Sequence, residues 1–243
     1  HGDRNMVRAL FLFLVAAPVM ALDAAQAQQQ TGGIQVAPVM IAMSAEHNIA
    51  SLRVRNGRNR PVAFEVDVYE WRQDNGRDVL TPTSDLLVAP GVFEIGAETE
   101  QVVRLGVLAA HAQTERAFRV VLRELPSQRR DGAVLGFMLE LSLPVFIAPI
   151  AARGHLEART EVRAEGATLI LSNTGRTHVR LASIETAEAG AVQAPRYLLS
   201  GASVEISLPR EARMVRIVSA DIGGAEAERI VHVDRPARHS ALR

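Results

Sequence analysis

The chain has 243 residues, its 27 acidic side chains are balanced by 27 basic ones, and it contains no cysteine. A balanced charge without a basic tail or stripe argues against a nucleic-acid partner. The lack of cysteine excludes both a disulfide framework and a thiol nucleophile. The length suits one larger domain or two small ones held by core packing alone.

Residues 1–27 have the pattern of a few upstream residues followed by an export signal. A short basic segment at 6–8 precedes the apolar run 9–22, and residues 25–27 read Ala-Gln-Ala, a small-x-small cleavage pattern. The apolar run is shorter than the roughly 20 residues of a membrane helix. We therefore expect cleavage after Ala27, export of the mature chain and no stable insertion in a membrane.

Short segments of alternating apolar and polar residues, separated by polar turns, dominate residues 28–148. This period of two is typical of half-buried β-strands, and no helical period is sustained. We expect one immunoglobulin-like domain here. Its expected strands are 36–42, 49–54, 62–71, 86–88, 92–95, 101–107, 118–125 and 134–146.

The last of these segments, VLGFMLELSLPVF at 134–146, is the most informative. Although Met138 breaks strict alternation, five large apolar residues fall at every second position and so share one face of a strand: Leu135, Phe137, Leu139, Leu141 and Leu143. As a single strand these residues would be about 40 Å long, well beyond a usual strand of about 5–6 residues. The pattern fits a long core strand, and it also fits a strand that is lent to another protein.

After an elbow at 148–154 a second series of short strands begins, which predicts a smaller domain over 149–236. Its expected strands are 167–172, 179–184, 196–199, 204–208, 214–218 and 230–233. Residues 237–243 have no pattern and are expected to form a frayed tail. The fold class predicted for the whole chain is all-β, with two immunoglobulin-like β-sandwich domains joined by a short elbow.

Signatures of catalysis are missing from the sequence. The seven histidines do not have the spacing of a zinc site and are expected at the surface or in turns. There is no glycine-rich phosphate loop and no Gly-x-Ser-x-Gly elbow. We therefore predict a protein that is not an enzyme and needs neither a metal nor a cofactor.

Three blocks, in order, resemble the PapD-like periplasmic pilus chaperones. The first is 82–106, in which Pro90, Phe93, Gln101 and Arg104 match a signature of that family. The second is AFRVVLRELP at 117–126, and the third is the long strand with its LPVFIAP ending. Stretches at 171–181 and 197–208 resemble the family's second domain, and LPVFIAP with Phe118-Arg119 is most similar to the archaic spore-coat-U/Csu-type branch.

The resemblance implies a periplasmic chaperone of the chaperone–usher pathway. Such a protein folds and caps pilin or spore-coat-U-like subunits by donor-strand complementation, a form of β-strand addition, and delivers them to an outer-membrane usher. The implied donor residues are the five of the alternating apolar face: Leu135, Phe137, Leu139, Leu141 and Leu143.

One departure from the family concerns the subunit's C-terminal carboxylate. Well-known members hold it with an Arg on the first strand and a Lys on the last, positions that fall at about Val39 and Pro144 here. Since neither is basic, Arg119 and Arg104 are the candidate anchors, because each sits in an otherwise apolar strand. The alternative is that both are arginines with a purely structural role.

A different class of function also fits an exported all-β chain: a structural or adhesive β-sandwich protein of a surface fibre. A pilin or adhesin should lack its own closing strand or carry a free N-terminal donor, and residues 28–33 are too polar to be that donor. Whether the free protein associates with itself through the exposed donor strand is left open.

Overall fold

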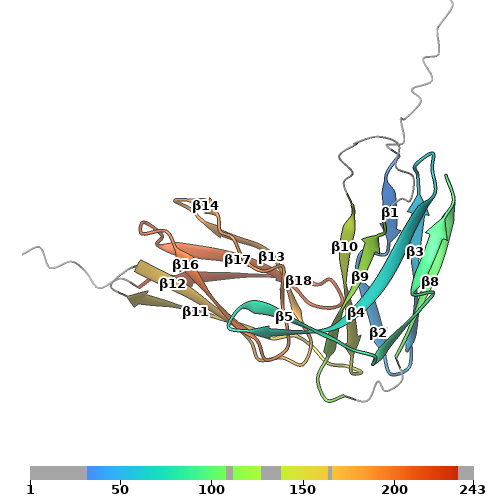
Figure 1. Ribbon diagram of the computed structural model, residues 1–243. Coiled ribbons are helices and arrows are strands. Elements are labelled where there is room, and N and C mark those ends of the chain that lie inside the picture. Colours follow the sequence, from blue (N-terminus) through green and yellow to red (C-terminus); the bar gives the residue numbers. More distant parts are fainter. Residues whose placement is uncertain (1–31, 108–111, 127–137, 164–165, 235–243) are drawn as a thin grey trace, which may run out of the picture. The chain divides into compact units, whose positions relative to one another are not determined.

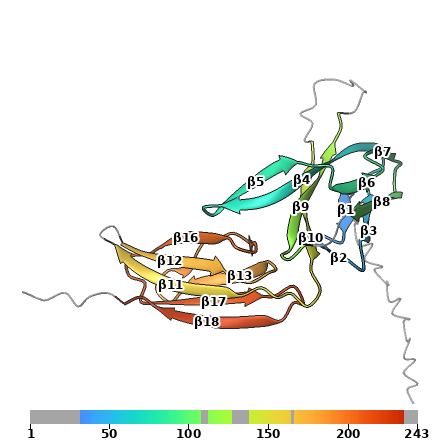
Figure 2. The ribbon, with the colours of Figure 1, turned by 90° about the horizontal axis from the view of Figure 1, so that it is seen from below.

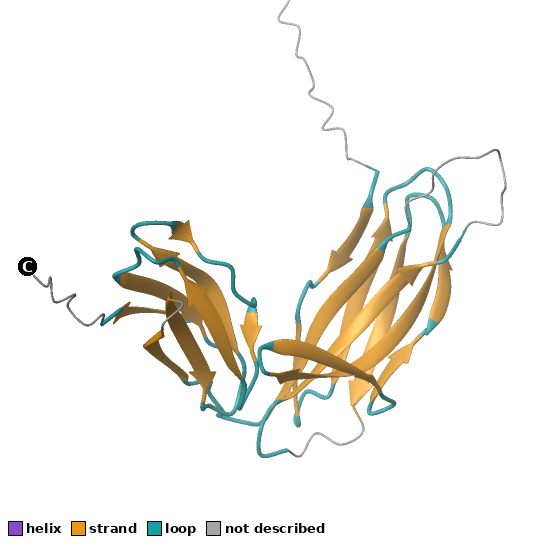
Figure 3. Ribbon diagram, turned by 60° about the vertical axis from the view of Figure 1, so that its left-hand side comes forward, coloured by secondary structure: helices purple, strands orange, loops and turns teal. Residues whose placement is uncertain are grey.

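The computed structural model describes residues 32–107, 112–126, 138–163 and 166–234 (Figure 1). Every regular element in these ranges is a β-strand (Figure 3), and none of them contains a helix that could cross a membrane. Strands up to Ala148 form two sheets, and strands from Leu156 onward form two others. The prediction of two immunoglobulin-like sandwiches is confirmed. The predicted export signal and frayed tail lie outside the described residues.

The first sandwich packs a four-stranded sheet, in the order β1-β3-β8-β6, against a six-stranded sheet in the order β2-β10-β9-β4-β5, with β7 paired to β4. Its strands are β1 (Ile34–Ala37), β2 (Ile41–Ser44), β3 (Ile49–Asn56), β4 (Val62–Asp74), β5 (Arg77–Pro82), β6 (Leu86–Ala89), β7 (Val92–Ile95), β8 (Glu100–Val107), β9 (Arg116–Glu124) and β10 (Glu140–Ala148).

The second sandwich has a three-stranded sheet, β11-β12-β16, and a five-stranded sheet, β14-β13-β17-β18, with β15 paired to β13. Its strands are β11 (Leu156–Arg163), β12 (Gly166–Asn173), β13 (Val179–Thr186), β14 (Gly190–Ala191), β15 (Tyr197–Leu198), β16 (Ser203–Leu208), β17 (Met214–Ala220) and β18 (Glu226–His232).

The period-two pattern of the sequence places the core of the first sandwich. In β4, Val62, Phe64 and Val66 are buried while the residues between them are partly exposed. Because successive side chains of a strand point to opposite faces, these three side chains meet those of β8 and β9 in one apolar cluster. This cluster fixes which face of β9 and β10 looks inward.

The prediction of a single strand at 36–42 is wrong. The chain forms β1 in one sheet and β2 in the other, with a bend at Pro38 between them. Proline has no amide hydrogen to donate to a ladder and its φ is fixed, so it ends the first pairing. The break lets β2 pair in parallel with the end of β10.

The turn expected at 73–76 is a two-residue hairpin turn between β4 and β5 (Figure 2). Asn75 and Gly76 both have positive φ, 48° and 75°, which is the conformation of a type I′ turn and explains the Asn-Gly pair. The strand that follows, β5, was not predicted, because all six of its residues are exposed and show no apolar alternation.

Candidate functional site

The strand β10 has a partner along nearly its whole length on one side and along only part of it on the other. It pairs with β9 from Glu140 to Ile147, whereas β2 covers only its last four residues. In the part of the chain that the structure describes, residues 140–144 therefore form an open edge of the six-stranded sheet. An open edge presents unpaired backbone groups and is a template for a further strand.

The direction of each backbone group on this edge follows from the pairing. The amide of Glu124 donates to the carbonyl of Leu139 at 2.8 Å, so Leu139 faces β9. Because the groups of an antiparallel strand alternate, Leu141 also faces β9, while the N–H and C=O of Glu140 and Ser142 point to the open side. Pro144 offers only its carbonyl there.

The structure places the predicted donor residues differently from one another. Leu143 is 7% exposed and belongs to the core of the first sandwich. Leu141 is partly buried against that core, and Leu139 is also partly buried. Leu143 could fill a partner's groove only by leaving its own core, so the available described donors are Leu139 and Leu141. Leu135 and Phe137 lie outside the described residues.

Arg119 lies at the inner end of this open edge. It is directly opposite Pro144 on β10 and Tyr69 on β4. Its guanidinium carbon lies 3.8 Å from the ring centroid of Trp71, Nη2 is 3.7 Å from an oxygen of Asp78, and the side chain is 17% exposed. Burial lowers the pKa of Arg119, and the negative charge of Asp78 opposes this shift. The guanidinium is thus partly desolvated and held over β4 and β5, on the side of β9 away from β10, so it would have to leave Trp71 and Asp78 to reach the open edge.

Arg104 is not brought to the same place. It is on β8, in the other sheet, opposite Ser51 and Ala89, and it is exposed. Its neighbours Val103 and Leu105 are buried in the core, so Arg104 points away from the core and from Arg119. The two arginines therefore cannot act together on one carboxylate.

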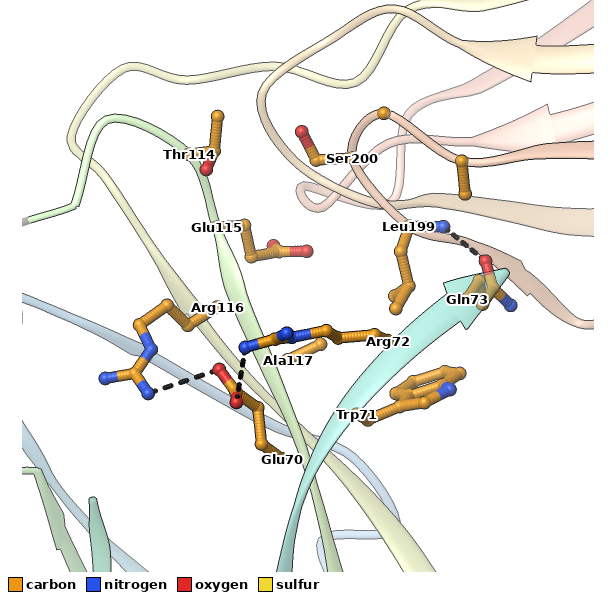
Figure 4. Close-up of a pocket in the computed structure, with 12 residues that line it drawn as sticks. Glu70, Trp71, Arg72, Gln73, Thr114, Glu115, Arg116, Ala117, Leu199 and Ser200 are labelled. Atoms are coloured by element: carbon orange, nitrogen blue, oxygen red, sulfur yellow. Dashed lines mark hydrogen bonds and ion pairs between the residues drawn. The ribbon is translucent and has the colours of Figure 1, made fainter. Parts of the chain in front are cut away.

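A cavity of about 350 Å³ lies beside the end of β4 and the start of β9 (Figure 4). The two arginines that line it are already paired with carboxylates. Nη2 of Arg72 lies 2.9 Å from Oε2 of Glu70. Nη2 of Arg116 lies 2.5 Å from Oδ2 of Asp85 and 3.4 Å from Oε1 of Glu70. Both arginines that line the cavity are therefore paired with carboxylates, so neither is free to attract a further anionic group.

One histidine, His178, is buried, although it lies in the connection between β12 and β13 as expected for a turn histidine. His178 is 2% exposed, and its Nδ1 lies 2.9 and 3.0 Å from the two carboxylate oxygens of Glu115. Its ring stacks on Phe146 with centroids 3.7 Å apart. Within the described residues no three metal-ligating side chains gather, and the buried ring nitrogen of His178 has the Glu115 carboxylate as its polar partner.

A family model described as pili and flagellar-assembly chaperone, PapD N-terminal domain, matches residues 33–153. This range contains β1 to β10, and with them the open edge and Arg119. The chain belongs to the PapD-like family of pilus-assembly chaperones. No curated protein sequence gave a significant match.

Solved structures agree with this PapD-like assignment. A chain of the CsuC–CsuE chaperone–tip adhesion subunit pre-assembly complex, from archaic Csu pili of Acinetobacter baumannii, matches with a TM-score of 0.65 at 19% identity, covering 82% of this chain and 97% of that chain. The Salmonella enterica SafA pilin–SafB chaperone complex matches with 0.65 at 16%, covering 84% and 96%. The E. coli chaperone DraB matches with 0.62 at 15%, covering 84% and 97%. At such identities these matches show the fold.

The two positions where the family resemblance places a basic pair lie in the bend between β1 and β2 and on β10. Val39 is 68% exposed in the bend between β1 and β2, and Pro144 is buried on β10. Trp71 and Asp78, which flank Arg119, were missed by the sequence analysis. Trp71 is the single tryptophan of the chain. Its position at the end of the alternating segment 62–71 was the sequence feature that could have pointed to it as part of the site.

Proposed function

We propose that this PapD-like chain is a periplasmic chaperone that captures a pilin-type subunit by strand addition at residues 140–144 and passes it to an outer-membrane usher. The observation that carries the proposal is the open edge of β10, which ends at Pro144, the residue opposite Arg119 on β9. The apolar side chains of Leu139 and Leu141, with Leu135 and Phe137 before them in the sequence, are the proposed donors.

A carboxylate anchor at Arg119 would also set the direction of the incoming strand. If the subunit's C-terminal carboxylate binds Arg119, the subunit strand ends beside Pro144, the residue opposite Arg119. A strand that runs along residues 140–144 and ends there runs parallel to β10. A guanidinium offers a planar pair of donors that suits a carboxylate, and Arg119 would act here without Arg104.

The matched complexes support the choice of partner. One pairs the SafB chaperone with the SafA pilin, and another is a chaperone–tip adhesion subunit complex of archaic Csu pili. We propose a subunit of this kind for the present chain, and the archaic branch as its relatives. The proposed route to the periplasm is the segment 1–27, with cleavage after Ala27.

The experiment that tests the proposal removes one hydrogen-bond donor from the open edge. In Ser142→Pro the lost N–H is one that points to the open side, a position where an edge strand tolerates proline, as Pro144 already shows two residues later. Ser142→Ala keeps the N–H and is the matched control. Each variant is co-expressed with a pilin-type subunit that the parent protein captures, and capture is measured by pull-down.

We expect Ser142→Pro to lose capture while Ser142→Ala keeps it, with equal melting temperatures for the two free proteins. Capture by both variants at the level of the parent would contradict strand addition at this edge. A parent protein that captures no subunit and instead polymerises would favour the alternative, a structural or adhesive protein of a surface fibre.

A further inference from the structure

Glu124, the last residue of β9, carries a carboxylate that is largely removed from water. Its side chain is 10% exposed, and it receives a two-point ion pair from Arg58, with Nη1–Oε1 at 2.5 Å and Nη2–Oε2 at 3.1 Å. Two parallel hydrogen bonds of this kind fix the orientation of a carboxylate as well as stabilising its charge. The pair joins the loop between β3 and β4 to the end of β9.

The loop that carries Arg58 is itself held in place. The side-chain amide of Asn56, which is fully buried, donates to the carbonyls of Arg60, Ile95 and Gly96 at 2.7, 3.2 and 3.0 Å. Its Oδ1 accepts the amide of Arg58 at 3.0 Å. Arg58 is thus presented to Glu124 by a hydrogen-bonded loop rather than by a free side chain.

On its other side Glu124 holds the residue just before β10. Its Oε2 accepts the amide of Leu139 at 3.3 Å, and its own amide donates to the carbonyl of Leu139 at 2.8 Å. Glu124 therefore hydrogen-bonds to both backbone groups of Leu139, to the N–H through its side chain and to the C=O through its main chain. Leu139 is the described donor residue farthest from the core-anchored end of β10.

We propose that Arg58 and Glu124 are positioning residues that hold Leu139 against β9 and so fix the point at which the open edge of β10 begins. The benefit for subunit capture rests on the proposed function. A strand edge that is ordered in advance avoids the conformational entropy lost on binding, and a shift by one residue would turn every apolar side chain to the opposite face.

The neighbouring ion pair of Arg123 and Glu140 does not hold the backbone of β10 in this way. Arg123 also contacts β10, through Glu140 at 3.1 Å, but both side chains are well exposed, at 40% and 59%. Within the described residues, its hydrogen bonds to Glu140 and Asp67 run between side chains and involve no backbone group of β10. Exposed pairs of this kind contribute little, whereas a buried charge that caps a backbone amide leaves that amide unsatisfied when it is removed.

The test measures amide hydrogen exchange in the free full-length chain. In Glu124→Ala we expect the exchange rate of the Leu139 amide to rise about tenfold or more, the effect of losing a hydrogen bond to a charged group. Glu124→Gln keeps an acceptor and should restore part of the protection. The amides of Val103 and Leu105 in β8 should keep their rates. Glu205→Ala, which breaks the exposed Arg163–Glu205 pair of the second sandwich, is the control.

An unchanged rate at Leu139 in Glu124→Ala would overturn the proposal, as would an equal rise at Leu139 and at the β8 amides. The same variants are then assayed for capture of the pilin-like subunit, where Glu124→Ala should fall below Glu124→Gln. Normal capture with a fast Leu139 amide would overturn the role in binding. Because the exchange measurement needs no subunit, failure of the parent to capture one would count against the proposed function alone.

Discussion

Arg119 of β9 lies directly opposite Pro144 of β10 in the antiparallel register. Pro144 is the position at which the family resemblance leads one to expect a lysine. Residues facing each other across an antiparallel pair have Cα atoms about 4.5–5.5 Å apart. A positive charge on the adjacent strand is therefore within side-chain reach of the place from which a lysine is missing, provided that the guanidinium leaves Trp71 and Asp78.

The first prediction concerns this arginine. Arg119→Ala should weaken subunit capture by about 2–5 kcal/mol, because the subunit carboxylate would be left without its partner. Arg119→Lys should recover only part of the loss, since a lysine keeps the charge but lacks the planar pair of donors. Capture is measured by pull-down from periplasmic extracts, together with a melting curve of each free protein.

The matched control for Arg119 is Arg104→Ala. Arg104 is an exposed arginine on the other sheet of the same sandwich, so its removal should leave capture unchanged. If Arg119→Ala lowers the melting temperature sharply and capture falls in proportion, Arg119 has a structural role through Trp71 and Asp78, and the anchor is refuted.

A second prediction tests the apolar face of the edge. Leu139→Glu should leave the chain folded and soluble but unable to retain its subunit, because a charge would enter an apolar groove. Leu80→Glu is the matched control: Leu80 is 43% exposed on β5, which is the opposite edge of the same sheet. Co-purification of the subunit with each variant is the measurement, and equal retention by the two would show that the donor face is assigned wrongly.

Strands with an inward apolar stripe were predictable from the sequence, and strands without one were not. Val62, Phe64 and Val66 give β4 its period of two, and the prediction there is confirmed. In β5 all residues are exposed, and β11 buries fully only Leu156. These two strands are stabilised by hydrogen bonds to a neighbouring strand, a contribution that leaves no periodic trace in the sequence.

The candidate site was predictable to a similar extent. The leucines at every second position point to the edge, and Arg119 could be singled out as a charge in an apolar strand. Their surroundings could not be predicted, because Trp71 and Asp78 reach Arg119 only through the pairing of β5, β4 and β9. Glu115 and His178 are 63 residues apart in the chain, and neither carries a local signal of burial.

The last prediction concerns the buried pair of Glu115 and His178, whose side chains are 1% and 2% exposed. The Glu115 carboxylate also accepts the backbone amide of His178 at 2.8 Å, and the Glu115 amide donates to the carbonyl of Arg176 at 2.8 Å. Removing one partner of such a pair leaves the other buried without compensation. Glu115→Ala should therefore lower the free energy of unfolding by about 3–5 kcal/mol.

The measurement is urea unfolding of Glu115→Ala, His178→Ala and the double variant. If the two side chains act as a pair, the double variant should lose much less than the sum of the single losses, because the second substitution removes a group that is already unpaired. Glu205→Ala, at an exposed ion pair, should change stability little. Additive losses at Glu115 and His178 would mean that each is held by its other contacts, for His178 the stack on Phe146, and that the ion pair itself contributes nothing to stability.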